Sequence, residues 1–252
     1  MKSKYLPIYL AVTLSTGQAV DFRVNEQALQ AGVRLQMWAQ QIQRGATNGA
    51  DMADFSIRRA YLYAGGALNP YFSGFLQAAG DRIGQANITE NTGLGIGSGF
   101  ALRDAWISAK PDEVFQLQFG RMFVPFMRIS GTESPFAQMG TDVASFQQGT
   151  MIPGRRVMRD DGVALWGNLA GGRIQYRTAI MDGANTSGTD GSLRWAGRVS
   201  LSLLEPETTW LVSQTYLQKK KVLTFGAGVD ALNRIAAGVN HRAWTVDAFA
   251  NP

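Results

Sequence analysis

The 252-residue sequence has no cysteine and a single histidine. Without cysteine there is no disulfide framework, no thiolate metal site and no cysteine nucleophile. The one histidine, His241, lies beside Asn240 and Arg242 and has no Ser or Asp motif that would complete a catalytic triad. We therefore interpret His241 as a solvent-exposed loop residue, and we expect no catalytic residue, no metal site and no cofactor.

Long apolar runs are also missing. After the first residues, no stretch approaches the roughly 18 to 20 apolar residues of a membrane-spanning helix. Residues 1–19 combine Lys2 and Lys4 with an apolar run and small residues before Ala19, which is typical of a secretory signal peptide, although a buried N-terminal strand has the same pattern. Cleavage there leaves residues 20–252 as one domain and lowers the formal net charge from +5 to +3 by removing two lysines. So mild an excess requires no nucleic-acid partner.

The residues that are present favour strands. The chain has 29 glycines and 10% aromatic residues but only 17% charged residues, a composition that suits short strands and tight turns. Phe115, Leu117 and Phe119 alternate with Gln116 and Gln118, which indicates a strand with one apolar and one polar face. Eleven segments are predicted as strands of an all-β, antiparallel fold: 29–43, 54–68, 71–83, 100–109, 114–124, 162–169, 173–181, 193–203, 208–217, 222–230 and 241–249. In 54–68 the alternation does not decide which of Arg58 and Arg59 lies on the polar face.

The connections differ systematically in length. Short ones at 69–70, 110–113, 170–172 and 204–207 alternate with longer ones at 44–53, 84–99, 125–161 and 182–192, as in membrane β-barrels with tight turns at one end. Alternation alone fits both a β-sandwich, whose apolar face is inside, and a barrel, whose apolar face meets lipid. The leader, the loop lengths and the aromatic residues favour a transmembrane β-barrel. A secreted or surface β-sandwich binding module is the alternative.

Five runs in order carry a family resemblance: FSIRRAYLYAGGALNPYFSGFLQ, LRDAWIS, FQLQFGRMFVPF, RDDGVALWGNL and KKKVLTFGAGVD. Over most of residues 29–249 the chain resembles the phosphate-selective porins O and P. The resemblance implies a homotrimeric barrel of about 16 strands in the outer membrane of a Gram-negative bacterium, in contact with lipid and lipopolysaccharide, with the loop 125–161 folded inward as a constriction. Because only about 11 strands are counted and the sequence ends on Pro252 rather than an aromatic residue, we expect an N-terminal fragment of such a barrel.

Arginines on the polar faces suggest which ions pass. Residues four apart on one strand face are roughly 13 Å apart, so arginines on two neighbouring strands form a stepped column, and rings of basic side chains select anions. The alternative is that these arginines pair with carboxylates such as Asp81 or Asp104. The predicted pore-lining residues are Arg34, Arg58, Arg103, Gln116, Gln118, Arg173, Arg177, Arg194 and Arg198, and the predicted constriction-loop residues are Arg128, Arg155, Arg156, Arg159, Asp160 and Asp161.

Lysine is scarce and its positions limit the prediction. It occurs only at residues 2, 4, 110, 219, 220 and 221, so the loop 125–161 lacks the lysine cluster of the family's phosphate-binding members. We therefore predict a water-filled diffusion channel for small solutes and ions with a weak anion preference, phosphate being one candidate. An outer-membrane enzyme is a further alternative, but the adjacent Asp160 and Asp161 would point to opposite faces of a strand. Alternation from Phe119 directs Arg121 toward lipid unless it lies at the rim or beside a bulge at Gly120.

Overall fold

The computed structural model describes residues 19–24, 27–42, 51–83, 101–128, 159–183, 192–236 and 239–252. Apart from the 3-10 turn Ala170–Gly172, its regular elements are the strands β1 (Ala19–Val24), β2 (Gln27–Ile42), β3 (Met52–Ala67), β4 (Phe72–Ile83), β5 (Ala101–Ala109), β6 (Gln116–Phe123), β7 (Arg159–Leu169), β8 (Ile174–Met181), β9 (Arg194–Ser202), β10 (Val222–Ala236) and β11 (Val239–Asn251). No helix among these residues is long and apolar enough to cross a membrane.

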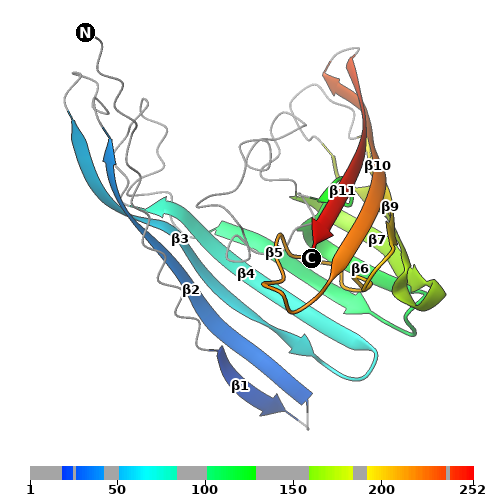
Figure 1. Cartoon of the computed structure of the whole chain (residues 1–252), viewed down its shortest axis with the longest axis horizontal. Coiled ribbons are helices and arrows are strands. Elements are labelled where there is room, and N and C mark those ends of the chain that lie inside the picture. Colours follow the sequence, from blue (N-terminus) through cyan, green and yellow to red (C-terminus); the bar gives the residue numbers. More distant parts are fainter. Residues whose placement is uncertain are drawn as a thin grey trace. The chain divides into compact units, whose positions relative to one another are not determined.

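The eleven strands follow one another in sequence order in one sheet (Figure 1), and the order does not return from β11 to β1. Neighbouring strands run antiparallel, as in the register of Gly226 with Asp247 between β10 and β11. Each of β2 to β11 overlaps a predicted segment, so the prediction of an all-β antiparallel fold is confirmed. The predicted strand 208–217 is wrong, because these residues belong to an irregular connection between β9 and β10, and β1 was not predicted.

The chain divides into two compact units. The first contains the described residues up to Gly66 and those within Phe75–Arg103, and the second contains Ala67–Gly74 and the described residues from Asp104 onward. The first unit thus holds β1, β2, all of β3 except Ala67 and most of β4, whereas the second holds most of β5 and all of β6 to β11. The charge clusters described below belong to the second unit.

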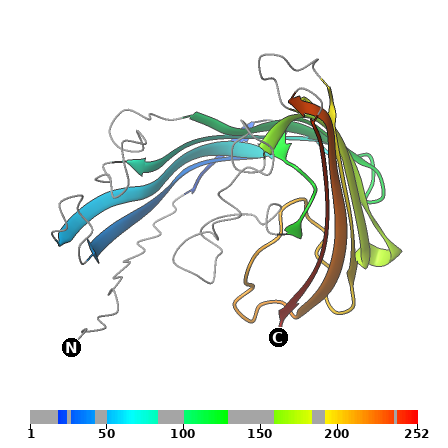
Figure 2. The same cartoon turned by 90° about the horizontal axis from the view of Figure 1, so that it is seen from above.

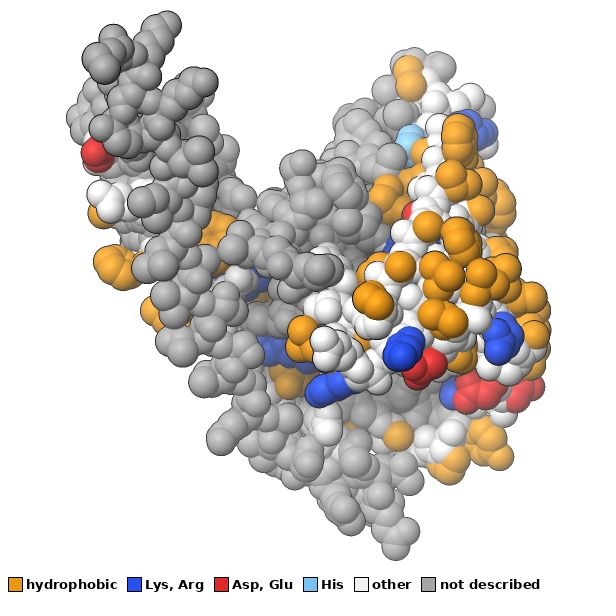
Figure 3. All heavy atoms as spheres, in the orientation of Figure 1, with side chains coloured by type: hydrophobic (Ala, Val, Ile, Leu, Met, Phe, Trp, Pro, Cys, Tyr) orange, Lys and Arg blue, Asp and Glu red, His pale blue; other side chains and the backbone are white. Residues whose placement is uncertain are grey.

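Large apolar side chains lie on the exposed face of the strands. In the second unit these are Ile107, Phe119, Val163, Ile180, Trp195, Val199, Phe225, Val229, Trp244 and Val246, the last two being 77% and 71% exposed. Many of the buried residues on the opposite face are polar: Asp104, Ser108, Gln116, Gln118, Arg177, Arg194, Arg198, Thr224 and Asp230. Figure 3 shows hydrophobic side chains gathered over β10 and β11. The polarity of the sheet is therefore the inverse of that of a β-sandwich, whose apolar faces meet in a dry core.

A β-bulge in β3 resolves the ambiguous phase of that strand. Gln36 of β2 pairs with Arg59, whereas the next residue, Met37, pairs with Ile57, so Arg58 is the extra residue. Such an insertion shifts the alternation by one position. Arg58 and Arg59 are consequently both buried, at 3% and 2% exposure.

The buried face of the second unit also carries a small apolar cluster. It consists of Met122, Phe123, Val124, Phe126, Ala164, Trp166, Ala179, Met181, Ala196 and Trp210. Trp166 of β7 packs edge-on against Trp210, with 5.6 Å between ring centroids. Trp210 comes from the connection between β9 and β10, which in Figure 2 is drawn in orange to one side of β10 and β11. This connection therefore folds onto the buried face of its own sheet.

Candidate pore lining

Most of the predicted pore-lining residues lie on the buried, polar face. Buried are Arg58, Gln116, Gln118, Arg177, Arg194 and Arg198; half-buried are Arg34 and Arg103; Arg173 is exposed. Arg173 lies beside the 3-10 turn, where its Nη1 donates to the Leu203 carbonyl at 3.1 Å. The burial of these side chains agrees with the predicted polar face, whereas their role in lining a pore stays a prediction.

The arginines of the first unit lie against aromatic rings. The guanidinium carbon of Arg34 is 4.8 Å from the centroid of the Tyr63 ring, and that of Arg103 is 4.9 Å from the Tyr61 ring. Arg103 Nη1 also donates to the Tyr61 hydroxyl at 2.7 Å. Such cation–π contacts hold a guanidinium in place without neutralising its charge.

Arg194 of β9 lies at the centre of a buried charge cluster in the second unit. Its Nε and Nη2 donate to the two carboxylate oxygens of Asp230 on β10 at 2.8 and 2.5 Å, and its Nη1 lies 3.5 Å from Asp160 Oδ2. Nε2 of His241 lies 3.2 Å from Asp230 Oδ2. His241 is therefore a partly buried residue of β11, and its interpretation as a solvent-exposed loop residue is wrong.

The end of the predicted constriction loop is part of a strand. Arg159, Asp160 and Asp161 begin β7 because they pair with the end of β6 in register. Arg159 donates to Asp104 Oδ1 at 2.8 Å and stacks over Phe123, so Asp104 pairs with a residue of the predicted constriction loop rather than with one of the predicted pore-lining arginines. Arg155 and Arg156 lie outside the described residues, as does the side chain of Asp81.

Asp160 and Asp161 point to opposite faces, as expected for adjacent strand residues. Asp160 is buried with Arg194, whereas Asp161 accepts two hydrogen bonds from Arg121, at 2.8 and 2.7 Å. Both side chains of the Arg121–Asp161 pair are about 40% exposed. The arginine that alternation directs toward lipid is thus neutralised by a carboxylate directly across the β6–β7 ladder.

Two arginines face each other directly across β8 and β9. Arg177 pairs with Arg198 in the strand register, an arrangement in which like charges repel. The Arg198 guanidinium instead crosses β10 and donates to both oxygens of Asp247 on β11, at 2.6 and 2.7 Å. A Cβ on Gly226 of β10 would lie 2.0 Å from Arg198 Nη2, so the glycine provides the space for this crossing.

Arg177 has a different environment. Its Nε donates to Gln175 Oε1 at 2.8 Å, its Nη2 donates to the Thr209 carbonyl at 3.2 Å, and its guanidinium carbon lies 5.1 Å from the centroid of the Trp210 ring. In the described part of the chain it forms no ion pair with a carboxylate. Among the arginines buried in the second unit, Arg177 therefore retains an uncompensated positive charge.

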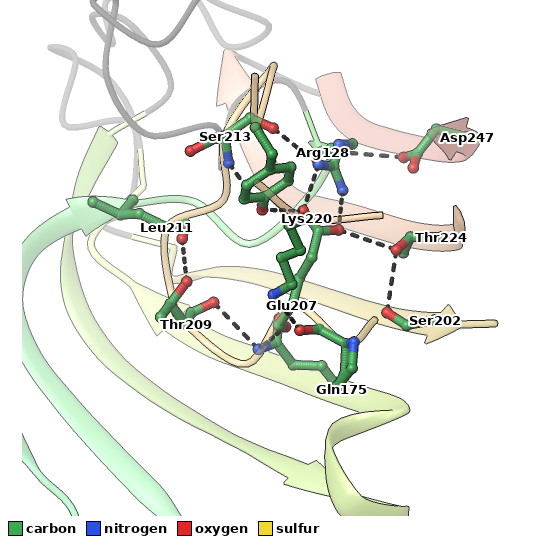
Figure 4. A network of polar contacts seen from close by, with 12 residues as sticks. Arg128, Gln175, Ser202, Glu207, Thr209, Leu211, Ser213, Lys220, Thr224 and Asp247 are labelled. Carbon is green, nitrogen blue, oxygen red and sulfur yellow. Dashed lines mark hydrogen bonds and ion pairs between the residues drawn. The ribbon is translucent and has the colours of Figure 1, made fainter. Parts of the chain in front are cut away.

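Arg128 and Glu207 form a further ion pair of the buried face (Figure 4). Arg128 Nη1 and Nη2 donate to the two Glu207 oxygens at 2.6 and 2.7 Å, and Glu207 also accepts hydrogen bonds from Tyr216 and Thr224. Burial would raise the pKa of Glu207, but these donors, above all Arg128, hold it below its ordinary range, so the carboxylate is ionised at neutral pH. Burial and the bond to Glu207 raise the pKa of Tyr216.

The backbone at Phe126, just after β6, packs directly against Gly228 of β10, and a substitution at Gly228 tests this contact. A Cβ on Gly228 would lie 1.9 Å from the Phe126 carbonyl oxygen, so Gly228→Ala must displace the backbone that leads to Arg128. Gly197→Ala on β9 is the matched control, because its Cβ would meet no atom nearer than 3.5 Å. We expect Gly228→Ala to lower the free energy of unfolding by about 1–3 kcal/mol, as overpacking does, and Gly197→Ala to cost less. Urea unfolding in detergent measures both, and equal losses would contradict the proposed docking contact.

One antiparallel sheet with an apolar exposed face and a charged buried face defines a protein of the outer-membrane β-barrel class. The family model for phosphate-selective porin O and P matches residues 29–156, half of the chain, and the chain belongs to this family. No curated protein matches the chain. Membership indicates a channel in the outer membrane rather than an enzyme, and strands β7 to β11 lie beyond the matched residues.

Proposed function

We propose that this protein is a passive diffusion channel in the outer membrane of a Gram-negative bacterium, selective by size and charge, with a weak preference for small anions. The observation that supports the channel is the polarity of the sheet, since polar residues are buried on one face while large apolar residues are exposed on the other. That arrangement suits a wall with water on its inner side and hydrocarbon on its outer side. The signal peptide at residues 1–19, the contact with lipopolysaccharide and the homotrimer belong to the same proposal.

Pairing of the charges argues for a weak rather than a strong anion preference. Arg128, Arg159, Arg194 and Arg198 each bind a carboxylate, so these cations contribute little net field. Arg177 is the exception among the buried arginines in the described part of the second unit, because its partners are neutral oxygens and an aromatic ring. The proposed preference therefore rests on Arg177, and the absence of lysine from the loop 125–161 argues against a dedicated phosphate site.

Arg177→Gln tests the proposed preference. In planar bilayers separating two KCl concentrations, the native channel is expected to give a reversal potential on the anion-selective side. Removal of the Arg177 charge is expected to lower the chloride-to-potassium permeability ratio by about twofold or more, whereas Arg177→Lys keeps the charge and most of the ratio. Cation selectivity of the native channel, or an unchanged ratio in Arg177→Gln, would contradict the role given to this residue.

The sandwich alternative conflicts with the arrangement of the strands. A β-sandwich requires two stacked sheets with apolar faces between them, whereas the described strands form one sheet with its apolar face exposed. Extraction of the protein from membranes separates the two cases experimentally, because a channel requires detergent and a secreted binding module does not.

A further inference from the structure

The connection between β9 and β10, residues 203–221, is anchored to the buried face of the second unit. We call it the inner segment. Its Trp210, Val212 and Glu207 side chains are buried, although none of the three belongs to a strand. Trp210 enters the apolar cluster beside Trp166 of β7. This connection lies at the same end of the sheet as the short turns after β3, β5 and β7. Connections at that end are expected to be short and exposed, whereas this one is long and partly buried.

Side chains from the strands bind the backbone of the inner segment (Figure 4). Asn168 of β7 donates to the Thr208 carbonyl at 2.9 Å. Gln175 of β8, labelled in Figure 4, donates to the Glu207 and Thr209 carbonyls at 3.2 and 3.3 Å. These bonds replace the ladder that a strand would provide. The inner segment is therefore held on β7 and β8 by residues that are themselves buried.

A second set of contacts fixes the other half of the inner segment. Asn251 of β11 accepts a hydrogen bond from the Tyr216 amide and donates one to the Lys220 carbonyl, both at 3.0 Å. The Tyr216 ring packs edge-on against Phe249 of β11. Arg128 joins the two sets because its Nη2, which binds Glu207, also donates to the Ser213 carbonyl at 3.0 Å.

We propose that the inner segment is a fixed constriction element of the channel, which narrows the ion path at the end of the sheet that carries the short turns. The inference rests on the proposed channel function, since it assigns an obstructing role within that channel. Its basis is the position of a 19-residue connection on the polar face, held by buried side chains of β7, β8 and β10 and by the partly buried Asn251 of β11. The segment thereby takes up space that would otherwise belong to the water-filled interior.

Single-cysteine labelling tests the inference in the folded protein, because the chain has no native cysteine. Thr209 is exposed within the inner segment, and Val199 is exposed on the apolar face of β9. Treatment of Thr209→Cys with a positively charged methanethiosulfonate reagent during a planar-bilayer recording is expected to lower the single-channel current by about twofold. The current of Val199→Cys and of the native protein is expected to stay unchanged.

Shortening of the inner segment gives an independent measurement. Its two ends already meet as a hairpin, with Leu203 N donating to the Leu223 carbonyl at 2.8 Å and Glu205 N to the Lys221 carbonyl at 3.0 Å. Replacement of residues 206–220 by Asn-Gly therefore closes a two-residue turn. Water replaces the lost partners of Arg128, Gln175 and Asn168, and the conductance is expected to rise about twofold or more.

The outcomes separate this inference from the channel proposal. If the native protein conducts but neither labelling of Thr209→Cys nor the shortened segment changes the current, the constriction role is overturned and the channel function stands. If the labelled Thr209→Cys loses current as expected, the inference is supported even where the shortened protein fails to fold. A native protein that forms no channel overturns the proposed function and this inference together.

Discussion

Replacement of Asp230 by alanine is expected to lower the free energy of unfolding by about 3–5 kcal/mol, the cost of leaving one member of a buried ion pair without its partner. Asp230 accepts two hydrogen bonds from Arg194 and lies beside His241. The Arg194 side chain is 2% exposed, and the nearer oxygen of its other carboxylate partner, Asp160, is 3.5 Å away. Alanine therefore leaves the guanidinium without two short charge-assisted bonds and without water to replace them.

Asp161→Ala is the matched control for Asp230→Ala. It removes the carboxylate of another bidentate arginine pair, that with Arg121, but both side chains of that pair are about 40% exposed. Arg121 and Asp161 lie within three residues of the ends of β6 and β7, where water at the membrane surface reaches them. An exposed pair in that position contributes at most about 1 kcal/mol, because solvent screens it and replaces its bonds. Urea unfolding of both variants in detergent measures the difference. Equal stability of the two variants would show that Arg194 reaches water, and the buried face would then have to be regarded as solvated at that point.

The alternation of side chains was enough to predict ten of the eleven strands of this sheet, β2 to β11. Phe115 to Phe119 and the segments like it have a period of two residues, which depends only on the local geometry of an extended chain. Around Arg58 the alternation is broken, so the sequence did not decide which of Arg58 and Arg59 lies on the polar face. The structure places a bulge there and buries both arginines. That outcome depends on the register with β2, which places Arg59 Nη1 2.6 Å from Gln36 Oε1.

The inner segment shows where local pattern fails. The run around Trp210 and Val212 has the aromatic and β-branched residues of a strand and was predicted as one. Its backbone carbonyls instead accept hydrogen bonds from the side chains of Asn168 and Gln175. Those donors are more than 30 positions away in sequence, so no window of neighbouring residues contains the information. Burial of Trp210 against Trp166 requires the same distant strand.

Which arginines bind a carboxylate could not be predicted from the sequence either. Spacing placed Arg177, Arg194 and Arg198 on one face, which their burial supports. It did not show which would be neutralised, because Arg198 and Asp247 are 49 positions apart and Arg128 and Glu207 are 79 apart. The sequence allowed two hypotheses, a continuous column of free positive charge and the pairing of arginines with carboxylates such as Asp104. Pairing describes most of the buried face of the second unit better.

Substitution of Val199 by arginine tests whether the exposed apolar face meets hydrocarbon. Val199 lies within β9, where its side chain is 53% exposed beside Tyr176 and Ala227 in the register. A charge on the lipid face near the bilayer midplane costs about 2–4 kcal/mol, and one near the interface about 0–1 kcal/mol. We therefore expect Val199→Arg to make folding into phosphatidylcholine vesicles less favourable by the larger amount.

Leu203→Arg is the matched substitution at the end of the same strand. Leu203 follows β9 directly and is 47% exposed, close to the value for Val199, so the two positions differ in depth rather than in burial. The expected cost is the smaller one, because a side chain at the strand end reaches the lipid headgroups and water. If the exposed face met water instead of hydrocarbon, both arginines would be tolerated alike in vesicles, as surface substitutions on a soluble protein are. A cost that depends on depth requires a low-dielectric layer outside the sheet. If hydrocarbon lies on that side, ions can cross only along the polar face on the other side.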